Sequence, residues 1–311
     1  MKKNLDNITV SFLSWHYKSP KIFLDTLRKM TPHCSGKWEN IIAVENPAEA
    51  IYSLIFDGYD GGYPKTRAIY FGQHPYIPNY SPSFRTFEDK DTCVARISLD
   101  KYFNAGEWWI KHTYDELMTL EPPKKTKDLA CIMTYQTHNP MYAQRVKFIQ
   151  ALVSKYTKFD LYGRPEERFR NDPILPKVFR GSLGVNKPEG ILGEHLIGKE
   201  IIQDYRYSLE FDVGPTKNYI SERFYDALLL WTMPIYFGSN NIETIIPKEA
   251  FHYINIHDLS QVDKVIEIIN GDSRERNIEA IREARNILLN KSQTWPFVSE
   301  IISNIDKYRR K

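Results

Sequence analysis

Short runs of β-branched and aromatic residues alternate with longer amphipathic stretches along this chain, and this alternation constrains the fold more than any other feature. The run at 8–15 predicts a strand, and the run at 19–30 predicts a helix with Ser19 as N-cap and Pro20 in its first turn. Further strands are predicted at 40–44, 67–73, 94–100 and 108–112, and 47–58 is predicted to begin as a helix and end as a strand. Strands that alternate with helices are typical of an α/β domain with a parallel sheet.

The stretch EPPKKTKD (121–128) interrupts this rhythm, which then starts again. Two prolines and a run of charges are typical of a linker, so we predict domains at 1–125 and 126–311, with the last helix packing back on the first domain. In the second domain, strands are predicted at 129–136, 159–163, 207–213, 233–238 and 251–259, helices at 141–156, 221–230, 261–290 and the C-terminus, and an irregular stretch at 164–198.

Composition and charge exclude several classes of protein. A hydrophobic fraction of 42% excludes wholesale disorder, and 42 Lys and Arg against 39 Asp and Glu leave a net charge of +3. That charge is too small to make nucleic acid or a membrane surface the main partner. The thiols Cys34, Cys93 and Cys131 have neither zinc-clamp nor redox spacing. Without a secretory leader or an 18-residue apolar run, the sequence predicts a soluble, cytoplasmic protein with reduced thiols.

The stretch 207–259 is the most informative for function, because a Gly-Pro loop there follows a buried strand and leads into a helix. Ser221 is a good N-cap residue, and Glu222 and Arg223 occupy the first turn. Free N–H groups at a helix start, with Arg223 and the loop residue Lys217, can bind a diphosphate. The Glu222 carboxylate can hold two vicinal ribose hydroxyls. The same pattern also fits an ordinary capped helix.

This stretch resembles the signature of the α-1,3-fucosyltransferases, glycosyltransferase family 10. The family pattern is phenylalanine-glutamate-asparagine, a short loop, tyrosine-x-threonine-glutamate-lysine, then a helix, a proline-isoleucine/valine-tyrosine strand and a glycine. Here it reads FDVGPTKNYISERFYDALLLWTMPIYFGS (211–239). Four further segments resemble bacterial members in order and spacing, at 46–58, 67–80, 137–152 and 159–164. The resemblance covers roughly residues 40–270.

The resemblance implies an inverting transferase of the GT-B plan, in which two Rossmann-like domains face a cleft. The C-terminal domain would bind the donor, GDP-fucose, and the N-terminal domain a glycan acceptor. At positions that match the family motif, Arg145 would contact the nucleotide phosphates and Tyr219 would lie near the nucleotide. Glu222 would bind the ribose, and Arg223 replaces the motif lysine while keeping its positive charge.

No obligatory metal is expected for this reaction. Arg145, Lys217, Arg223 and the helix N-terminus would neutralise the charge on the departing diphosphate. The acidic run at 88–91 resembles the metal-binding aspartate-x-aspartate of the other transferase superfamily, but it follows a Pro/Ser-rich turn. We therefore predict a solvated loop there.

The chain departs from the family where the catalytic base is expected. The family has a glutamate in a turn of the N-terminal domain, and the matching turn here reads FGQH, with Gln73 at that position. Inversion requires a group that accepts the proton of the acceptor hydroxyl, and glutamine does not. The candidates are His74 in the same turn, Asp57 at the end of LIFDG, and His16 just after the first strand. A changed donor or acceptor, or an inactive protein, are further interpretations of Gln73.

Two alternatives for the function stay open. The helix at 221–228 also resembles the serine-x-arginine-phenylalanine-x-glutamate/aspartate-alanine-leucine run of exostosin-type transferases. Those enzymes use UDP-sugars, so a donor such as UDP-xylose is an alternative to GDP-fucose. A non-catalytic glycan- or nucleotide-binding protein on the same scaffold is the second alternative, because of Gln73.

Overall fold

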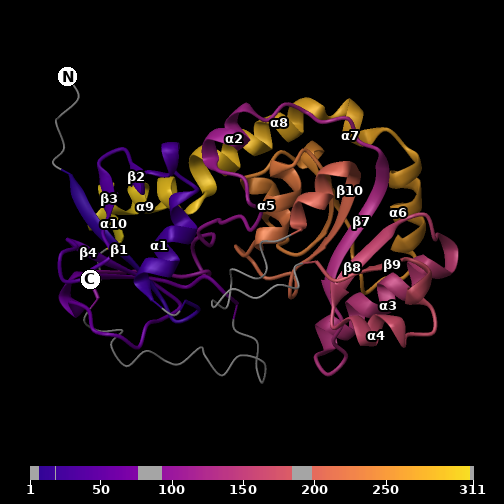
Figure 1. Cartoon of the computed structure of the whole chain (residues 1–311), viewed down its shortest axis with the longest axis horizontal. Helices are drawn as coiled ribbons and strands as arrows, with labels where there is room; N and C mark the ends of the chain where they lie inside the picture. The colour runs from indigo at the N-terminus through magenta and orange to yellow at the C-terminus, as the bar shows by residue number, and fades with distance from the viewer. Residues whose placement is uncertain (1–6, 18, 76–92, 184–197, 309–311) are drawn as a thin grey trace.

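The computed structural model describes residues 7–17, 19–75, 93–183 and 198–308 (Figure 1). The acidic run at 88–91 lies outside these residues. The strands are β1 (Ile8–Ser14), β2 (Lys37–Trp38), β3 (Ile41–Ala43), β4 (Tyr52–Phe56), β5 (Ala68–Phe71), β6 (Ala95–Ile97), β7 (Lys127–Thr134), β8 (Asp160–Arg164), β9 (Phe179–Gly181), β10 (Tyr205–Phe211), β11 (Met233–Phe237) and β12 (His252–Tyr253). The helices are α1 (Pro20–Arg28), α2 (Tyr114–Thr119), α3 (Pro140–Lys155), α4 (Glu166–Arg170), α5 (Glu222–Leu229), α6 (Gln261–Asn270), α7 (Ser273–Arg276), α8 (Ile278–Ile287), α9 (Thr294–Ser303) and α10 (Ile305–Tyr308).

The first six strands form one sheet in the order β2-β3-β1-β4-β5-β6. Neighbouring strands in this sheet are parallel, except that β2 is antiparallel to β3. The last five residues of β1 are buried, as expected for a central strand of a parallel sheet. Strand β1 lies between β3 and β4 in this sheet. The chain therefore builds β2 and β3 on one side of β1 and then crosses to the other side to form β4. Ligands bind beyond the carboxyl ends of strands where the order reverses in this way.

The other six strands form a parallel sheet in the order β12-β11-β10-β7-β8-β9. Here the order reverses between β7 and β10, so the loop that joins β10 to α5 starts at the reversal. The predicted strands at 129–136, 159–163, 207–213 and 233–238 are confirmed as β7, β8, β10 and β11. The helix predictions at 19–30, 141–156 and 221–230 are confirmed as α1, α3 and α5, and the Ser19 side chain caps α1 by accepting from the Ile22 N–H at 3.3 Å.

Two predictions in the N-terminal half are wrong. The segment 47–58 does not begin as a helix: residues 47–49 form a turn in which the Asn46 side chain accepts from the Ala48 N–H at 3.0 Å, and β4 follows. The segment 108–112 is not a strand, because the N–H groups of Trp109 and Ile110 donate to the Asp226 carboxylate instead of a neighbouring strand.

One further prediction is wrong in the C-terminal half. Only His252 and Tyr253 of the segment 251–259 pair as a strand, since an Asn255 side chain that accepts from the His257 N–H at 3.1 Å turns the chain away. The prediction that 261–290 is helical is confirmed: the segment forms α6, α7 and α8, and α6 ends at Gly271. The described part of 164–198 contains α4 and β9.

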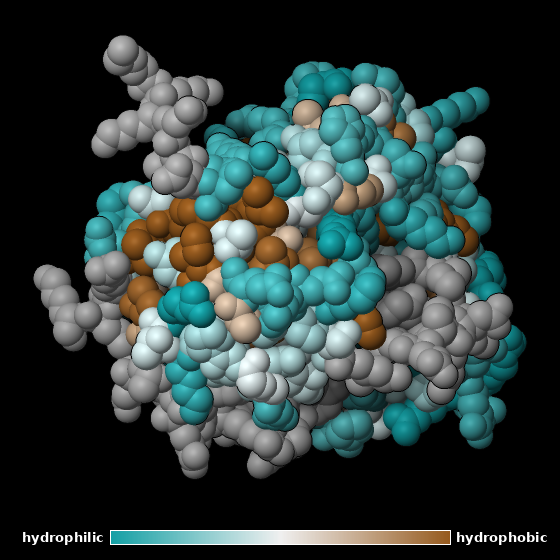
Figure 2. Space-filling model, turned by 60° about the vertical axis from the view of Figure 1, so that its left-hand side comes forward, coloured by the Kyte–Doolittle hydropathy of each residue, from teal (hydrophilic) through white to brown (hydrophobic). Residues whose placement is uncertain are grey.

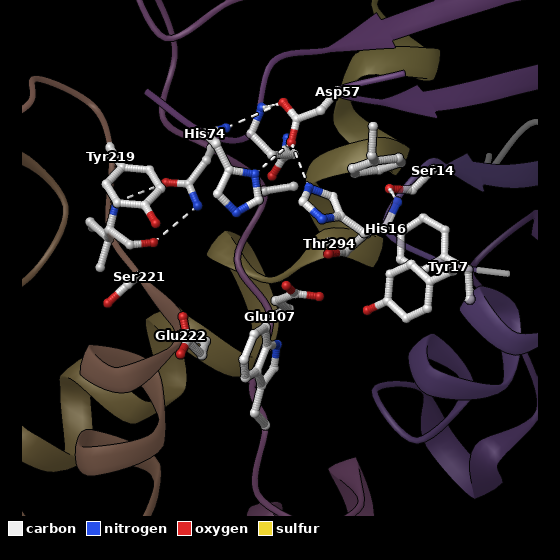
Figure 3. A pocket seen from close by; sticks show the side chains of 17 residues that line it. Ser14, His16, Tyr17, Asp57, His74, Glu107, Tyr219, Ser221, Glu222 and Thr294 are labelled. Atoms are coloured by element: carbon white, nitrogen blue, oxygen red, sulfur yellow. Dashed lines mark hydrogen bonds and ion pairs between the residues drawn. The ribbon is translucent and has the colours of Figure 1, made fainter. Parts of the chain in front are cut away.

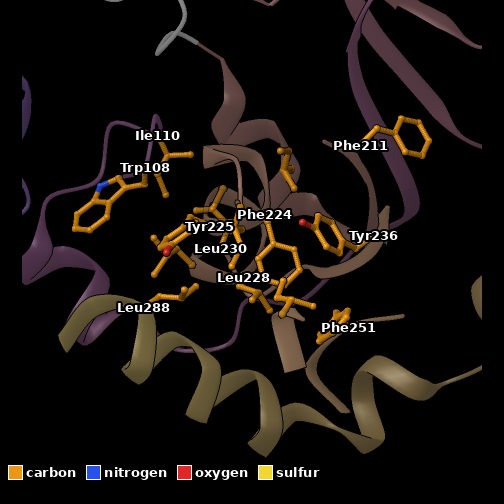
Figure 4. Close-up of a cluster of buried hydrophobic side chains, with 14 of the residues drawn as sticks. Trp108, Ile110, Phe211, Phe224, Tyr225, Leu228, Leu230, Tyr236, Phe251 and Leu288 are labelled. Atoms are coloured by element: carbon orange, nitrogen blue, oxygen red, sulfur yellow. The ribbon is translucent and has the colours of Figure 1, made fainter. Parts of the chain in front are cut away.

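The segment 104–110, which we call the strap, crosses between the two halves. Asn104 exchanges side-chain hydrogen bonds with the backbone of Ile220 at 2.9 and 3.0 Å. Gly106 bonds to the backbone of Ser292 and Thr294 at 2.9 and 2.8 Å, and a Cβ at Gly106 would lie 2.3 Å from the Tyr225 ring. Figure 4 shows the strap residues Trp108 and Ile110 beside the apolar side of α5. The strap therefore holds the start of α5 at a fixed place relative to the first sheet.

The C-terminal helix α9 packs on the N-terminal sheet. The Trp295 indole donates to the Leu27 carbonyl at 2.9 Å, and its ring lies 5.0 Å from that of Phe12. Figure 1 shows α9 and α10 in yellow beside the indigo strands. Figure 2 shows a mostly hydrophilic face with one main hydrophobic patch and a few scattered hydrophobic residues. In the described part of the chain, no helix combines the length and apolar character needed to cross a membrane.

Candidate active site

A cavity of about 130 Å³ lies between the two sheets, and both halves of the chain line it (Figure 3). Three of its lining segments follow the carboxyl ends of the adjacent strands β1, β4 and β5, and another is the loop that enters α5. The strap forms part of its floor. The polar lining residues are Ser14, His16, Tyr17, Asp57, Gln73, His74, Asn104, Glu107, Tyr219, Ser221, Glu222 and Thr294.

Asp57 and His74 form a hydrogen-bonded dyad at the ends of β4 and β5. Asp57 Oδ2 lies 2.5 Å from His74 Nδ1, and Asp57 Oδ1 accepts from the N–H groups of Gln73 and His74 at 2.7 and 3.3 Å. The Asp57 backbone is in the left-handed region, with φ of 57°, and the Tyr70 hydroxyl donates to its carbonyl at 2.8 Å. The Asp57 side chain is 3% exposed, whereas 44% of the His74 side chain is exposed.

The two members of the dyad shift each other's pKa in opposite directions. Burial opposes the charge on Asp57, but the nearby His74, the His16 imidazole and the hydrogen bonds from His74 and Gln73 hold the pKa of Asp57 below its usual value. Burial would lower the pKa of His74, but the Asp57 carboxylate outweighs it and raises that pKa. Since Nδ1 faces Asp57, the other ring nitrogen of His74 is the one available for proton transfer.

His16 completes a group of three on this side of the cavity, which we call the N-terminal wall (His16, Asp57 and His74). His16 Nε2 lies 3.7 Å from Asp57 Oδ2. That nitrogen is buried and has no hydrogen-bond partner among the described residues. The three base candidates thus come together, although β1, β4 and β5 are well separated in sequence.

On the opposite side of the cavity, Glu222 belongs to a buried charged group with Lys199, Arg223 and Asp226, which we call the C-terminal wall; of these four, Glu222 alone lines this cavity. Lys199 Nζ lies 2.8 Å from Asp226 Oδ2 and 3.3 Å from Glu222 Oε1. Burial would raise the pKa of Glu222, but the charges of Lys199 and Arg223 lower it to about 2. Glu222 lines both this cavity and a second one of about 230 Å³ that Arg223, Lys199 and the ends of β7 and β8 also line. Glu222 and the strap residue Trp109 line both cavities, so the two cavities meet at the start of α5.

The structure places the other predicted binding residues differently. Ser221 occupies the N-cap position of α5, but its side chain makes no capping hydrogen bond, and its N–H donates to the Asp212 carboxylate at 3.3 Å. Tyr219 is buried and lines the first cavity, with its ring 6.1 Å from that of His74. Lys217 is exposed and lines neither of the two cavities.

Arg145 is only 1% exposed and lies on α3 with its guanidinium 4.3 Å from the Tyr142 ring centre. Burial, together with the charge of Arg223, lowers its pKa. Its Nε and one terminal nitrogen are buried without a hydrogen-bond partner in the described residues. Buried donors without partners are costly, and a bound anion would satisfy them.

Three residues of the site were missed from the sequence. Glu107 sits on the strap, just before the segment 108–112 that was predicted to be a strand, and faces the cavity between the two walls (Figure 3). Burial raises the pKa of Glu107, and the charge of Glu222 raises it further. Lys199 follows the stretch predicted to be irregular, and Asp226 was noted only as part of the exostosin-like run. No local pattern marks Glu107 or Lys199, because their role depends on what the fold brings beside them.

Comparisons with known proteins agree on one family. The model of glycosyltransferase family 10 (fucosyltransferase), C-terminal part, matches residues 122–277. The α-(1,3)-fucosyltransferase FucT of Helicobacter pylori is 30% identical over 219 residues, which are 65% of this chain. The match covers 43% of the length of that relative.

Solved structures give the same fold at low identity. The crystal structure of α1,3-fucosyltransferase with GDP-fucose matches with a TM-score of 0.51 and 14% identity, over 100% of this chain and 95% of that one. The DNA-modifying enzyme β-glucosyltransferase, solved in the presence and absence of its substrate uridine diphosphoglucose, matches with a TM-score of 0.50 and 12% identity, over 96% and 100%. The predicted GT-B plan of two parallel-sheet α/β units is thereby confirmed.

Proposed function

This chain belongs to glycosyltransferase family 10, and on that premise we propose that it is an inverting transferase that moves fucose from GDP-fucose to a hydroxyl of a glycan acceptor. One observation carries the proposal: across the first cavity, a histidine–carboxylate dyad beside one sheet faces Glu222 beside the other, and fixed positive charges hold the Glu222 carboxylate. Such a cavity can hold the acceptor hydroxyl near a base while the donor is bound on the opposite side.

On the donor side, the C-terminal wall supplies the binding groups. We propose that Glu222 accepts hydrogen bonds from the ribose hydroxyls and that Arg223 contacts the diphosphate. The unpartnered nitrogens of Arg145 and the N–H groups at the start of α5 would stabilise the same charge. We assign a supporting role to Tyr219 beside the nucleotide, whereas Lys217 is exposed and would approach only the outer end of the donor.

On the acceptor side, His74 replaces the missing family glutamate as the base. Its cavity-facing nitrogen takes the proton as the acceptor oxygen attacks C1 of fucose from the face opposite the nucleotide. The C1–oxygen bond to GDP breaks, GDP leaves with the electron pair, and the configuration at C1 inverts. Asp57 fixes the imidazole and stabilises its protonated form, as in other histidine–carboxylate pairs. Gln73 takes part through its backbone N–H, which holds Asp57 at 2.7 Å.

The same proposal divides the chain at 125/126, with acceptor binding before that point and donor binding after it. The two sheets lie on either side of this division. Glu107 would accept a hydrogen bond from an acceptor hydroxyl, because it faces the cavity between the walls. We place the protein in the cytoplasm, where Cys34, Cys93 and Cys131 would remain free thiols.

A panel of nucleotides tests the donor first. We expect GDP and GDP-fucose to raise the melting temperature, because a ligand that binds only the folded state stabilises it, by about 2.7 kcal/mol at 100 times Kd. Stabilisation by UDP, UDP-xylose or UDP-glucose instead would contradict the GDP-fucose assignment and favour the exostosin-like alternative.

Release of GDP from GDP-fucose then tests catalysis. Slow donor hydrolysis by the wild type, lost in His74→Ala and kept in His33→Ala, is the expected result. His33 is a matched control because it is an exposed histidine that lies 3.3 Å from Asp115 and does not line the cavity. Stabilisation by GDP-fucose with no turnover, in the presence of a glycan acceptor panel, would identify a binding protein and overturn the transferase.

A further inference from the structure

The N-terminal wall has the composition of a metal site. His16, Asp57 and His74 each offer one ligand atom, and these atoms all lie within 4.8 Å of one another. They are the one such group found in the ranges that the structure describes. The Asp57 Oδ2 atom lies 2.5 Å from His74 Nδ1 and 3.7 Å from His16 Nε2. Ligands of tetrahedral zinc, with bonds of about 2.0–2.1 Å, are separated by about 3.3 Å, so only small shifts are required.

The three ligand atoms are already positioned by the surrounding fold. Asp57 Oδ1 is held by two backbone N–H groups, which leaves Oδ2 as a single coordinating oxygen. The His16 ring lies against the Trp15 ring, with the ring centres 3.8 Å apart and the planes tilted by 30°, and its Nε2 is buried with no hydrogen-bond partner among the described residues. Contacts of this kind orient metal ligands and tune their affinity. A metal ion bound between His16 Nε2 and Asp57 Oδ2 would give this imidazole nitrogen a partner.

We propose that His16, Asp57 and His74 bind one divalent transition-metal ion of the Zn²⁺ class. Two imidazoles and one carboxylate suit Zn²⁺, Co²⁺ or Ni²⁺, whereas Mg²⁺ and Ca²⁺ prefer oxygen ligands. All three residues line the cavity, so a water molecule from it would complete the coordination of the ion. The ion is not a requirement of transfer.

The ion would act as an inhibitor, a consequence that depends on the proposed role of His74 as the base. An imidazole that coordinates a metal through Nδ1 carries its proton on the other nitrogen. The cavity-facing nitrogen then donates a hydrogen bond and cannot accept the acceptor proton. Occupancy of the site and base catalysis by His74 therefore exclude each other.

Direct binding decides the proposal without any donor or acceptor. We would titrate the apo protein with Zn²⁺ by calorimetry and with Co²⁺ by its visible absorption. The expected result is one ion per chain, with affinity at least about 10-fold weaker in His16→Ala and in Asp57→Asn and unchanged in the surface control His33→Ala. His16 is the more secure variant, since 28% of its side chain is exposed and its loss leaves the Asp57–His74 bond intact. Failure to bind, or equal binding by His16→Ala, overturns the site.

Donor hydrolysis tests the inhibition separately. We expect Zn²⁺ to stop GDP release from GDP-fucose by the wild type, with recovery after chelation, and to inhibit His16→Ala only at higher concentration. Binding without inhibition would overturn the exclusion between the ion and base catalysis. A protein that never hydrolyses the donor would count against the proposed function alone, because the binding titration is decided without it.

Discussion

The two walls of the cavity each hold a buried carboxylate, but they neutralise it in different ways. On the N-terminal wall, imidazoles and backbone N–H groups surround Asp57. On the C-terminal wall, Lys199 lies between Glu222 and Asp226, with Arg223 beside them. Imidazoles exchange protons near neutral pH, whereas Lys and Arg stay charged. The first wall is therefore suited to moving a proton and the second to holding a polar, charged ligand in place.

Removing the titratable group should give the largest effect. We expect His74→Ala to lower kcat for transfer by about 10²–10⁴-fold, the range for losing a general base, and to leave donor affinity unchanged. Steady-state kinetics together with calorimetric GDP binding measure the two effects. If Asp57→Ala shows such a fall and His74→Ala does not, the base is Asp57. If neither variant matters, His16 is next.

Removing the positive charge of Lys199 should lower the stability of the fold more than it lowers the rate of proton transfer. Lys199→Met leaves the fully buried Asp226 without its cation, which should lower the free energy of unfolding by about 3–5 kcal/mol. Urea unfolding measures this loss. Lys155→Met is the matched control, because Lys155 pairs with Asp263 at 2.7 Å on the exposed surface, and we expect its stability to be nearly unchanged. Equal stability of the two variants would show that Lys199 does not hold the C-terminal wall together.

The pH dependence of stability sharpens the same comparison. The pKa of Glu222 is lowered to about 2, against about 4.3 in an unfolded chain. Its ionised form therefore stabilises the fold fully above the unfolded value, and this contribution is lost as the pH falls toward about 2. The 2.3-unit gap corresponds to about 3 kcal/mol, and roughly half of it should be gone at about pH 3. The difference in unfolding free energy between wild type and Glu222→Gln should shrink accordingly between about pH 5.5 and 3; a constant difference would contradict the shift.

The smallest effect concerns the donor itself. Glu222→Ala removes a charged hydrogen-bond acceptor from the proposed ribose site, so donor binding should weaken by about 1.5–3 kcal/mol. Calorimetry with GDP measures this change, with His33→Ala as the control. Unchanged affinity in a folded variant would remove Glu222 from the donor site and leave it as a structural partner of Lys199.

Local patterns in the sequence were sufficient to predict most of the strands and helices that support the two walls. Alternating apolar runs predicted the central strands, the Ser19 cap predicted the start of α1, and the family motif around Glu222 predicted the loop and helix beside the donor. The same logic failed at 47–58 and 108–112, where side chains of Asn46 and Asp226 take up backbone N–H groups that a periodic pattern assigns to regular structure. Local patterns cannot include a partner that comes from elsewhere in the chain.

By itself, the sequence determined that the chain forms parallel α/β sheets and that His16, Asp57 and His74 each follow a predicted strand. Only the tertiary structure decided that these three meet, because the order β1-β4-β5 within the sheet places their strand ends side by side. It likewise brought Lys199 between Glu222 and Asp226, and placed Glu107 in the cavity by fixing the strap to both halves. A charge or an acid becomes functional through its neighbours, and those neighbours are set by strand order and packing, not by spacing along the chain.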